Sequence, residues 1–221
     1  MASRASKTLP NVMDRLKFLA EFLRSPLKVG SPIATSSRTI ERLLAEVEWS
    51  NTRCFLEYGP GTGEFTRYIL DHLPRDAELI VIESDTDLAN HLRDTIKDKR
   101  LTVHTDSAVR ARTILGNKSA GQVDYILSGI PFSSLGMLQR RQIADDASML
   151  LRPEGKFLAY QVRRSIENHL HAHFRKVRRQ RVWLNLPPYH LYVCSMPRAD
   201  RPPPSRQAIA DRSERKCRSL R

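Results

Sequence analysis

Three acidic residues stand where short apolar runs of the chain end. They are Glu57, Glu83 and Asp106. Carboxylates accept hydrogen bonds from hydroxyl and amino groups, and they attract cations. Because the carboxyl ends of parallel strands meet at one edge of a sheet, the three acids should lie close together. Their positions predict a polar site for a ligand that carries positive charge.

A glycine-rich stretch follows the first acid and runs into a predicted helix. Gly59, Gly61 and Gly63 let the backbone turn sharply and approach a ligand, beside the unpaired amides of the helix start. A dinucleotide site spaces its glycines G-x-G-x-x-G, whereas here Glu64 takes the place of the last one. Glu57 would repel a pyrophosphate. It would attract the ammonium and sulfonium groups of S-adenosylmethionine, by up to ~4 kcal/mol at ~4 Å and an effective dielectric of ~20. The loop therefore favours methyl-transfer chemistry; the alternative is a turn that only connects strand to helix.

The other two acids have a ligand-binding and a structural interpretation each. Glu83 could accept from both hydroxyls of a ribose, or it could be a solvated acid at a helix start. Asp106 could accept from an adenine amino group, or cap the helix that follows. Three serines beside the strand ends complete the predicted cofactor-binding set, namely Ser84, Ser107 and Ser128.

Apolar runs and helical patterns alternate along the middle of the chain. We predict strands near 53–58, 78–83, 101–105, 122–128 and 155–162, and helices near 36–48, 63–72, 85–97, 107–115, 136–151 and 164–175. Such alternation predicts an α/β fold, with a mostly parallel sheet covered by helices on both faces. Residues 177–186 and 190–196 should form a final pair of strands.

Residues 53–161 resemble the class I S-adenosylmethionine-dependent methyltransferases, which have a Rossmann-like sheet. The finer resemblance, over roughly residues 12–197, is to bacterial phospholipid N-methyltransferases. It rests on the segments 29–37, 57–63, 128–132 and 185–188. It implies that S-adenosylmethionine is bound by Glu57, the three glycines and Glu83. It also implies that phosphatidylethanolamine and its methylated derivatives are the acceptors, on the way to phosphatidylcholine.

The fourth predicted strand ends in Ser128-Gly129-Ile130-Pro131, which should border the transferred methyl group. Adenine and RNA-base dimethyltransferases resemble the chain here but carry Asn or Asp where Gly129 stands. Glycine offers no side-chain acceptor for a planar amino group. It should leave space for a tetrahedral amine, so Gly129, Ile130 and Pro131 are predicted to bind the substrate and nucleic acid is not the expected partner.

Two tyrosines and two arginines lie farther along the same predicted edge. Tyr160 and Tyr189 are candidates for catalysis or for an aromatic face that contacts a methylated cation, and half-buried structural roles are the alternative. Arg163 and Arg164 could hold a lipid phosphate, or they could form a solvated helix start. His169, His171 and His173 alternate and lack helical metal-ligand spacing, so no metal is expected.

The net charge of +13 is concentrated in peripheral segments. Residues 1–28 carry +4, residues 163–181 carry +6 and residues 198–221 carry +5. Such a distribution fits an anionic partner, either lipid or nucleic acid. Residues 11–24 read as an amphipathic helix, which could lie in a membrane interface or pack on the core. By resemblance, the interface is favoured.

These observations predict three parts. Residues 1–35 should form a membrane-binding helix and a loop covering the cofactor, residues 36–197 a methyltransferase domain, and residues 198–221 a disordered basic tail. The expected location is cytoplasmic, peripheral on the inner face of the cell membrane, with no obligate protein partner. The competing hypotheses are an RNA adenine N6-dimethyltransferase-like enzyme and a non-enzymatic membrane-binding protein that keeps only the fold.

Overall fold

The computed structural model describes residues 37–116, 121–182 and 189–197. The predicted N-terminal helix, residues 185–188 and the basic tail lie outside these residues. The described elements follow one another in the order α2 (Ser37–Leu44), η1 (Trp49–Asn51), β1 (Cys54–Tyr58), α3 (Glu64–His72), β2 (Glu78–Glu83), α4 (Thr86–Thr95), β3 (Leu101–Thr105), η2 (Ala108–Arg110), α5 (Ala111–Leu115), β4 (Val123–Ser128), η4 (Phe132–Ser134), α6 (Met137–Leu150), β5 (Leu151–Gln161), α7 (Glu167–His173), β6 (Phe174–Val182) and β7 (Tyr189–Pro197).

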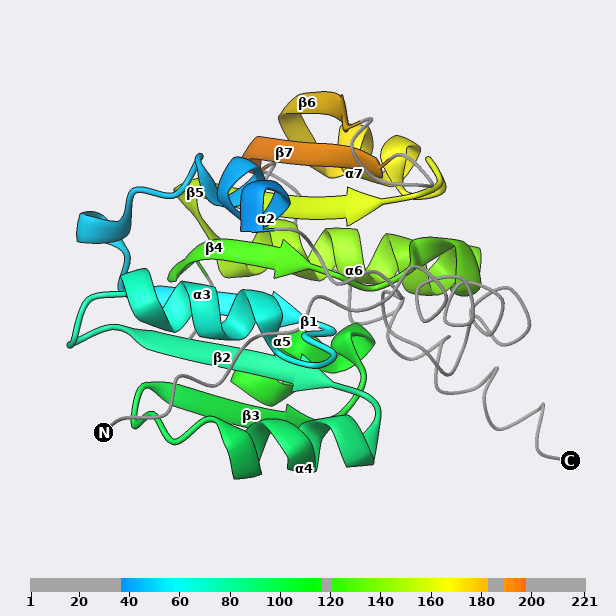
Figure 1. Cartoon of the computed structure of the whole chain (residues 1–221). Coiled ribbons are helices and arrows are strands. Elements are labelled where there is room, and N and C mark those ends of the chain that lie inside the picture. Colours follow the sequence, from blue (N-terminus) through cyan, green and yellow to red (C-terminus); the bar gives the residue numbers. More distant parts are fainter. Residues whose placement is uncertain (1–36, 117–120, 183–188, 198–221) are drawn as a thin grey trace, which may run out of the picture.

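These strands form one seven-stranded sheet in the order β3-β2-β1-β4-β5-β7-β6. Strands β1 to β5 are mutually parallel, and β7 runs antiparallel between β5 and β6 (Figure 1). The predicted α/β fold of a class I methyltransferase is thereby confirmed. Strand order places the ends of β1 and β4 side by side at the centre of the carboxyl edge, where such sheets bind ligands.

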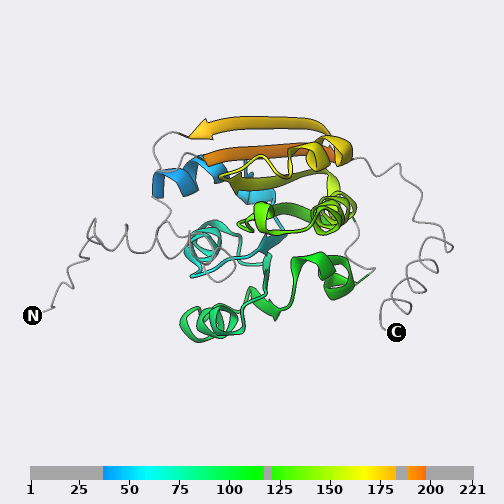
Figure 2. The ribbon, with the colours of Figure 1, turned by 90° about the vertical axis from the view of Figure 1, so that its right-hand side faces the viewer.

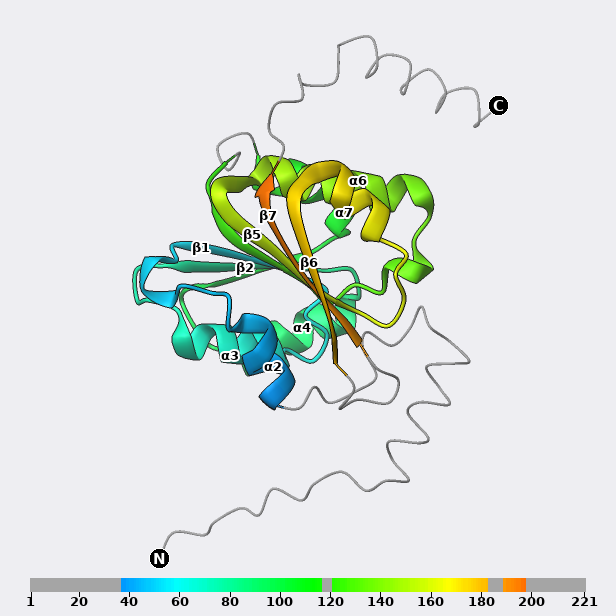
Figure 3. The same cartoon turned by 90° about the horizontal axis from the view of Figure 1, so that it is seen from above.

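Helices cover both faces of the sheet, with α2, α3 and α4 on one side and α5, α6 and α7 on the other (Figures 2 and 3). One apolar cluster lies under α2 and α3 and includes Phe55 and Leu158. A second lies under α6 and α7 and includes Leu56 and Phe157. Neighbouring residues of β1 and β5 thus bury opposite faces, which explains the consecutive apolar residues Cys54–Leu56 and Phe157–Ala159.

The element boundaries near the C-terminal strands differ from the sequence prediction. The helix predicted at 164–175 ends at His173, and β6 begins at Phe174 rather than at residue 177. Phe174 is buried and stacks on Phe157 with ring centroids 6.0 Å apart. Packing between strands therefore overrides the local helical pattern.

The described residues contain no helix that is both long and apolar enough to span a bilayer. Nor do they contain a group of three or more His, Cys, Asp and Glu side chains placed to hold a metal ion.

Candidate active site

The glycine loop adopts the backbone geometry that its sequence requires. Gly59, Gly61 and Gly63 have φ values of 65°, 58° and 83°, in the left-handed region that favours glycine. The Gly59 N–H donates to the carbonyl of Ile82, so the loop is anchored to β2 as it leaves β1. Its backbone passes directly over the carboxyl edge of the sheet.

Glu57 is a buried acid beneath this loop. The residue is 2% exposed, and its carboxylate accepts a 2.7 Å hydrogen bond from Thr66 Oγ1 in α3. Burial raises the pKa of Glu57 to about 8; the Thr66 bond opposes this shift, and the charge of Glu83 adds to it. No cation of the described residues contributes to the pKa of Glu57. A cationic ligand would therefore relieve the cost of ionising this carboxyl.

Glu83, at the end of the neighbouring strand β2, accepts a hydrogen bond from the glycine loop. Its Oε2 accepts from the Gly61 N–H at 3.2 Å, and its Oε1 accepts from the Asp85 N–H at 3.0 Å. Asp85, not Ser84 or Glu83, caps α4, because its carboxylate accepts from the amides of Asp87 and Leu88. The solvated-acid interpretation of Glu83 is thus wrong: the residue is 6% exposed, and its carboxylate is oriented by the Gly61 amide.

A small cavity of about 80 Å³ opens beside the loop on the α6 side of the sheet. Gly59, Ser84, Asp106 and Ser107 line its polar side, and Ile82, Ile130, Leu135 and Ile143 contribute to its apolar side. Asp106 pairs with Arg110 at 3.0 Å, and the Ser107 hydroxyl caps η2 through the Val109 N–H. The flat purine of a nucleoside suits such a slot, because apolar walls contact its faces and an acid meets its edge.

Ser128, the last predicted cofactor residue, lies elsewhere. Its side chain is fully buried, and its hydroxyl has no hydrogen-bond partner in the part of the chain that the structure describes. It is not among the residues that line the cavity.

The residues predicted to border the methyl group do meet at the centre of the edge. The Gly129 N–H donates to the carbonyl of Tyr58, and the Ile130 side chain lies against Gly59. A Cβ atom at Gly129 would lie 2.6 Å from Tyr160 Oη and 2.8 Å from the Gly59 carbonyl oxygen. The expectation that Gly129 leaves open space was wrong, because the Tyr160 hydroxyl already lies where a side chain would begin.

Tyr160 belongs to a cluster of three aromatic rings beside this point. Its ring stacks on Phe65 with centroids 5.1 Å apart and meets Tyr189 edge-on at 6.0 Å. Tyr160 and Tyr189 are 8% and 4% exposed. The cluster joins the start of α3 to the ends of β5 and β7, so the predicted tyrosines are brought together.

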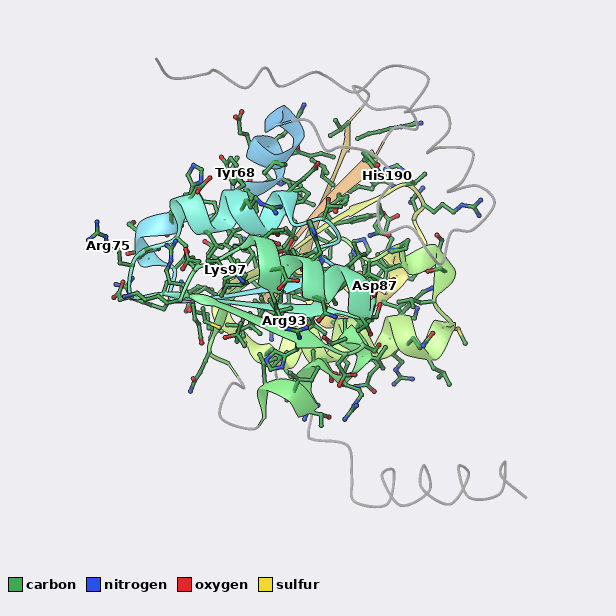
Figure 4. The ribbon with its side chains drawn as sticks, turned by 60° about the horizontal axis from the view of Figure 1, so that its bottom comes forward. Tyr68, Arg75, Asp87, Arg93, Lys97 and His190 are labelled. Carbon is green, nitrogen blue, oxygen red and sulfur yellow. The ribbon has the colours of Figure 1, made fainter. Side chains whose placement is uncertain are left out.

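The two predicted arginines lie farther out. Arg163 is exposed, and Arg164 Nε pairs with Glu167 at 2.5 Å. Arg179 shares the same carboxylate at 3.2 Å. Both cations therefore hold the pKa of Glu167 below its usual range, with the Arg164 hydrogen bond as the largest cause. Figure 4 shows His190 and Asp87, near the starts of β7 and α4, on the opposite side of the molecule from Arg75.

Sequence reasoning missed three residues that shape the site. Thr66 holds Glu57, Phe65 stacks on Tyr160, and Gln161 connects β5 to the loop after β4. The Gln161 amide donates to the Ile130 carbonyl at 2.7 Å and accepts from the Phe132 N–H at 3.1 Å. A glutamine at the end of a predicted buried strand was the available signal, since a buried amide must find partners.

Sequence comparison finds two kinds of relative. The sequence model of the ribosomal RNA adenine dimethylase family matches residues 25–122. An ornithine lipid N-methyltransferase of Singulisphaera acidiphila is 31% identical over 146 residues, which are 65% of this chain and 76% of that protein. Ribosomal RNA small subunit methyltransferase A of Pelagibacter ubique is 26% identical over 143 residues, which are 56% of this chain and 52% of that protein.

Solved structures share the fold. Human methyltransferase-like protein 13, solved with S-adenosylhomocysteine, has a TM-score of 0.61 at 18% identity, covering 77% of this chain and 86% of that one. The 1,6-didemethyltoxoflavin-N1-methyltransferase of Burkholderia thailandensis has a TM-score of 0.56 at 15% identity, covering 86% and 92%. Fold, loop geometry and sequence agree: the chain belongs to the class I S-adenosylmethionine-dependent methyltransferases, in the family that contains the ornithine lipid N-methyltransferase of Singulisphaera acidiphila.

Proposed function

We propose that the chain methylates the amine of a membrane-lipid headgroup, with phosphatidylethanolamine and its methylated derivatives as acceptors. The observation that carries this proposal is the surroundings of Gly129. A side chain that accepts from a planar base amine cannot be placed there, because its Cβ would contact the Gly59 carbonyl oxygen at 2.8 Å. The relative that acts on ornithine lipid supports an aminolipid acceptor.

The acids and the glycine loop hold the cofactor in this proposal. Glu57 and Glu83 face the cationic and hydroxyl-bearing parts, and the cavity beside Ser84 and Asp106 takes the adenine ring. When bound, S-adenosylmethionine would supply the methyl group, whose carbon would bond to the acceptor nitrogen as the carbon–sulfur bond breaks. The pair of electrons from the broken bond stays on sulfur, and the acceptor loses one proton to water for each methyl added.

The aromatic cluster receives the acceptor. The Tyr160 hydroxyl oxygen can accept from an amine N–H beside Gly129, and the rings of Phe65, Tyr160 and Tyr189 form a wall for a methylated cation. An amine with a lysine-like pKa of ~10.4 costs about 4–5 kcal/mol to deprotonate at pH 7. A wall that excludes water lowers this cost, because it disfavours the charged amine.

The competing function is methylation of an adenine in RNA. Two findings favour it: the ribosomal RNA adenine dimethylase family matches residues 25–122, and residues 163–181 carry seven Lys and Arg. It predicts RNA binding that weakens steeply with salt. Gly129 argues against it, since the loop lacks the side-chain acceptor that would align a base.

The test is to incubate the protein with labelled S-adenosylmethionine and each class of acceptor. Anionic vesicles carry phosphatidylethanolamine or ornithine lipid, parallel reactions contain ribosomal RNA, and products are identified by mass. We expect label in phosphatidylethanolamine and its mono- and dimethyl forms. Label in ornithine lipid alone would redirect the proposal to that headgroup, and label in RNA alone would refute it.

A further inference from the structure

The exposed apolar side chains of the described residues gather at the carboxyl edge of the sheet. Four large apolar side chains are exposed: Met137 at 70%, Leu138 at 73%, Val162 at 37% and Met196 at 47%. Met137 and Leu138 begin α6, and Val162 directly follows β5. Both positions lie at the end of the sheet where the arrowheads of β4 and β5 point (Figure 1). Met196 alone lies near the far end of antiparallel β7.

Hydrogen bonds link the two segments that carry these apolar side chains. The Arg140 guanidinium donates to the Ser133 carbonyl at 3.4 Å and to the Ser165 carbonyl at 3.5 Å, bridging the start of α6 and the β5–α7 turn. Gln161 ties the end of β5 to the loop that precedes η4. The backbone that carries the exposed side chains is therefore fixed by hydrogen bonds to neighbouring segments.

Two exposed arginines lie next to these side chains in the chain. Arg141 follows Leu138 by one helical turn, and Arg163 follows Val162; both are exposed, and neither has an ion pair within residues 37–116, 121–182 and 189–197. Burial lowers the pKa of His169 in α7, and His173, Arg140 and Arg141 lower it further, so the charge of Arg141 is felt at α7. We name Met137, Leu138, Arg141, Val162 and Arg163 the edge patch.

The chemistry of the edge patch suits a bilayer surface better than RNA. Exposed methionine and leucine side chains contribute little to binding a phosphate backbone, which interacts with cations and hydrogen-bond donors. In a membrane interface, apolar side chains enter the acyl boundary while neighbouring arginines contact anionic headgroups. Both properties occur here, at the start of α6 and in the turn that follows β5.

We propose that the edge patch docks on anionic membranes and turns the carboxyl edge of the sheet, where Gly129 follows β4, towards the headgroups. This inference rests on the proposed function, since it names the membrane contact of the same site. It adds a contact that is independent of residues 11–24. An amine would then reach the Tyr160 hydroxyl without leaving the headgroup layer.

Binding of the full chain to vesicles tests the docking without any methyl transfer. Vesicles of phosphatidylglycerol and phosphatidylcholine are sedimented with each variant, with no cofactor present. We expect the double variant Met137→Gln/Leu138→Gln to lower the partition coefficient about tenfold, because two apolar side chains lose their burial. We expect Arg141→Gln to lower it about fivefold, an effect that disappears in high salt.

Matched controls lie at the opposite edge of the sheet. Met196→Gln removes an exposed apolar side chain, and Arg75→Gln removes an exposed arginine (Figure 4). Both should bind vesicles like the parent chain. If these controls weaken vesicle binding as much as the edge-patch variants do, binding depends on overall hydrophobicity or charge rather than on the edge patch, and the inference fails.

An environment-sensitive label reports insertion of the edge patch directly. Leu138→Cys and Met196→Cys are labelled in a Cys217→Ser background, in which Cys54 and Cys194 are buried. The label at position 138 should shift to blue on anionic vesicles, and the label at 196 should not. No shift at 138, or equal vesicle binding by the Met137→Gln/Leu138→Gln variant, overturns the inference.

Activity separates failure of the docking from failure of the proposed function. On a monomeric short-chain phosphatidylethanolamine, Met137→Gln/Leu138→Gln should match the parent chain, whereas on vesicles its rate should fall with its binding. If the parent chain methylates no lipid yet binds through the edge patch, the proposed function fails and the docking stands. If lipid is methylated and the variant performs equally on vesicles, the docking fails alone.

Discussion

Glu57 offers the sharpest quantitative test of the site, because its burial links cofactor binding to proton release. Its pKa of about 8 means that the carboxyl is mostly neutral at pH 7 when no ligand is bound. A cationic ligand favours the ionised form. Binding at pH 7 should therefore release a proton, and the variant Glu57→Gln should release none from this position.

The size of the effect follows from the pKa. Only about one Glu57 in a hundred is ionised at pH 6 and about half at pH 8, so the Kd should fall about fiftyfold between these values, about 2.3 kcal/mol. The Kd should level off above pH 8. In Glu57→Gln this part of the pH dependence should vanish.

Calorimetry measures both quantities. Titrations with S-adenosylmethionine in two buffers of different ionisation enthalpy give the number of protons released. Because the ligand's own amino group titrates, the informative quantity is the difference between the parent chain and Glu57→Gln. Parallel pH curves for the two proteins, or the same proton count at pH 7, would refute the assignment of Glu57 as a buried neutral acid.

The same shift affects stability without ligand. The folded pKa of Glu57 lies above its usual value of 4.5, so the folded state holds a proton that the unfolded chain has lost. The contribution of Glu57 to the free energy of unfolding should be fully present below pH 4.5 and decline as pH rises through 8. Comparing denaturant unfolding of the parent chain with that of Glu57→Gln isolates this trend.

Two further predictions concern the acceptor side. Gly129→Ala should destabilise the fold by about 1–3 kcal/mol, because its Cβ would crowd Tyr160 and the Gly59 carbonyl. Gly136→Ala is its control, since the nearest atom to that Cβ is 3.6 Å away, and equal denaturation midpoints for the two would contradict the reasoning. Tyr160→Phe should keep the ring stack but slow methyl transfer about thirtyfold, the value of one ~2 kcal/mol hydrogen bond to a charged group, with cofactor affinity unchanged. Tyr68→Phe, on the outer part of α3 (Figure 4), should leave the rate unchanged; an unaffected Tyr160→Phe rate would exclude the hydroxyl from the reaction.

The sequence predicted those parts of the site that local patterns determine. The apolar runs predict the strands. A parallel sheet then places Glu57, Glu83 and Asp106 at one edge, regardless of the conformation of the loops. The glycine spacing likewise predicted a loop with positive φ values, which the structure has. These features depend on residues close together in the chain.

Contacts between distant segments were beyond that reasoning. The space at Gly129 is set by the Gly59 carbonyl and by Tyr160, which no local pattern relates to it. Gln161 accepts a hydrogen bond from the Phe132 amide, which lies 29 residues earlier in the chain, and Phe65 of α3 stacks on Tyr160 of β5. β6 begins early for the same reason. Phe174 packs against Phe157 of β5 instead of continuing the helical pattern of the residues before it.

The placement of β7 between β5 and β6 has a consequence for synthesis and folding. During translation, β5 and β6 are both made before the strand that joins them, so each presents an unpaired edge in the nascent chain. Tyr189 arrives with that last described strand, which means that the aromatic wall cannot form earlier. A chain cut before residue 189 should therefore be prone to edge-to-edge association and unable to accept a substrate, even though every residue of its glycine loop is present.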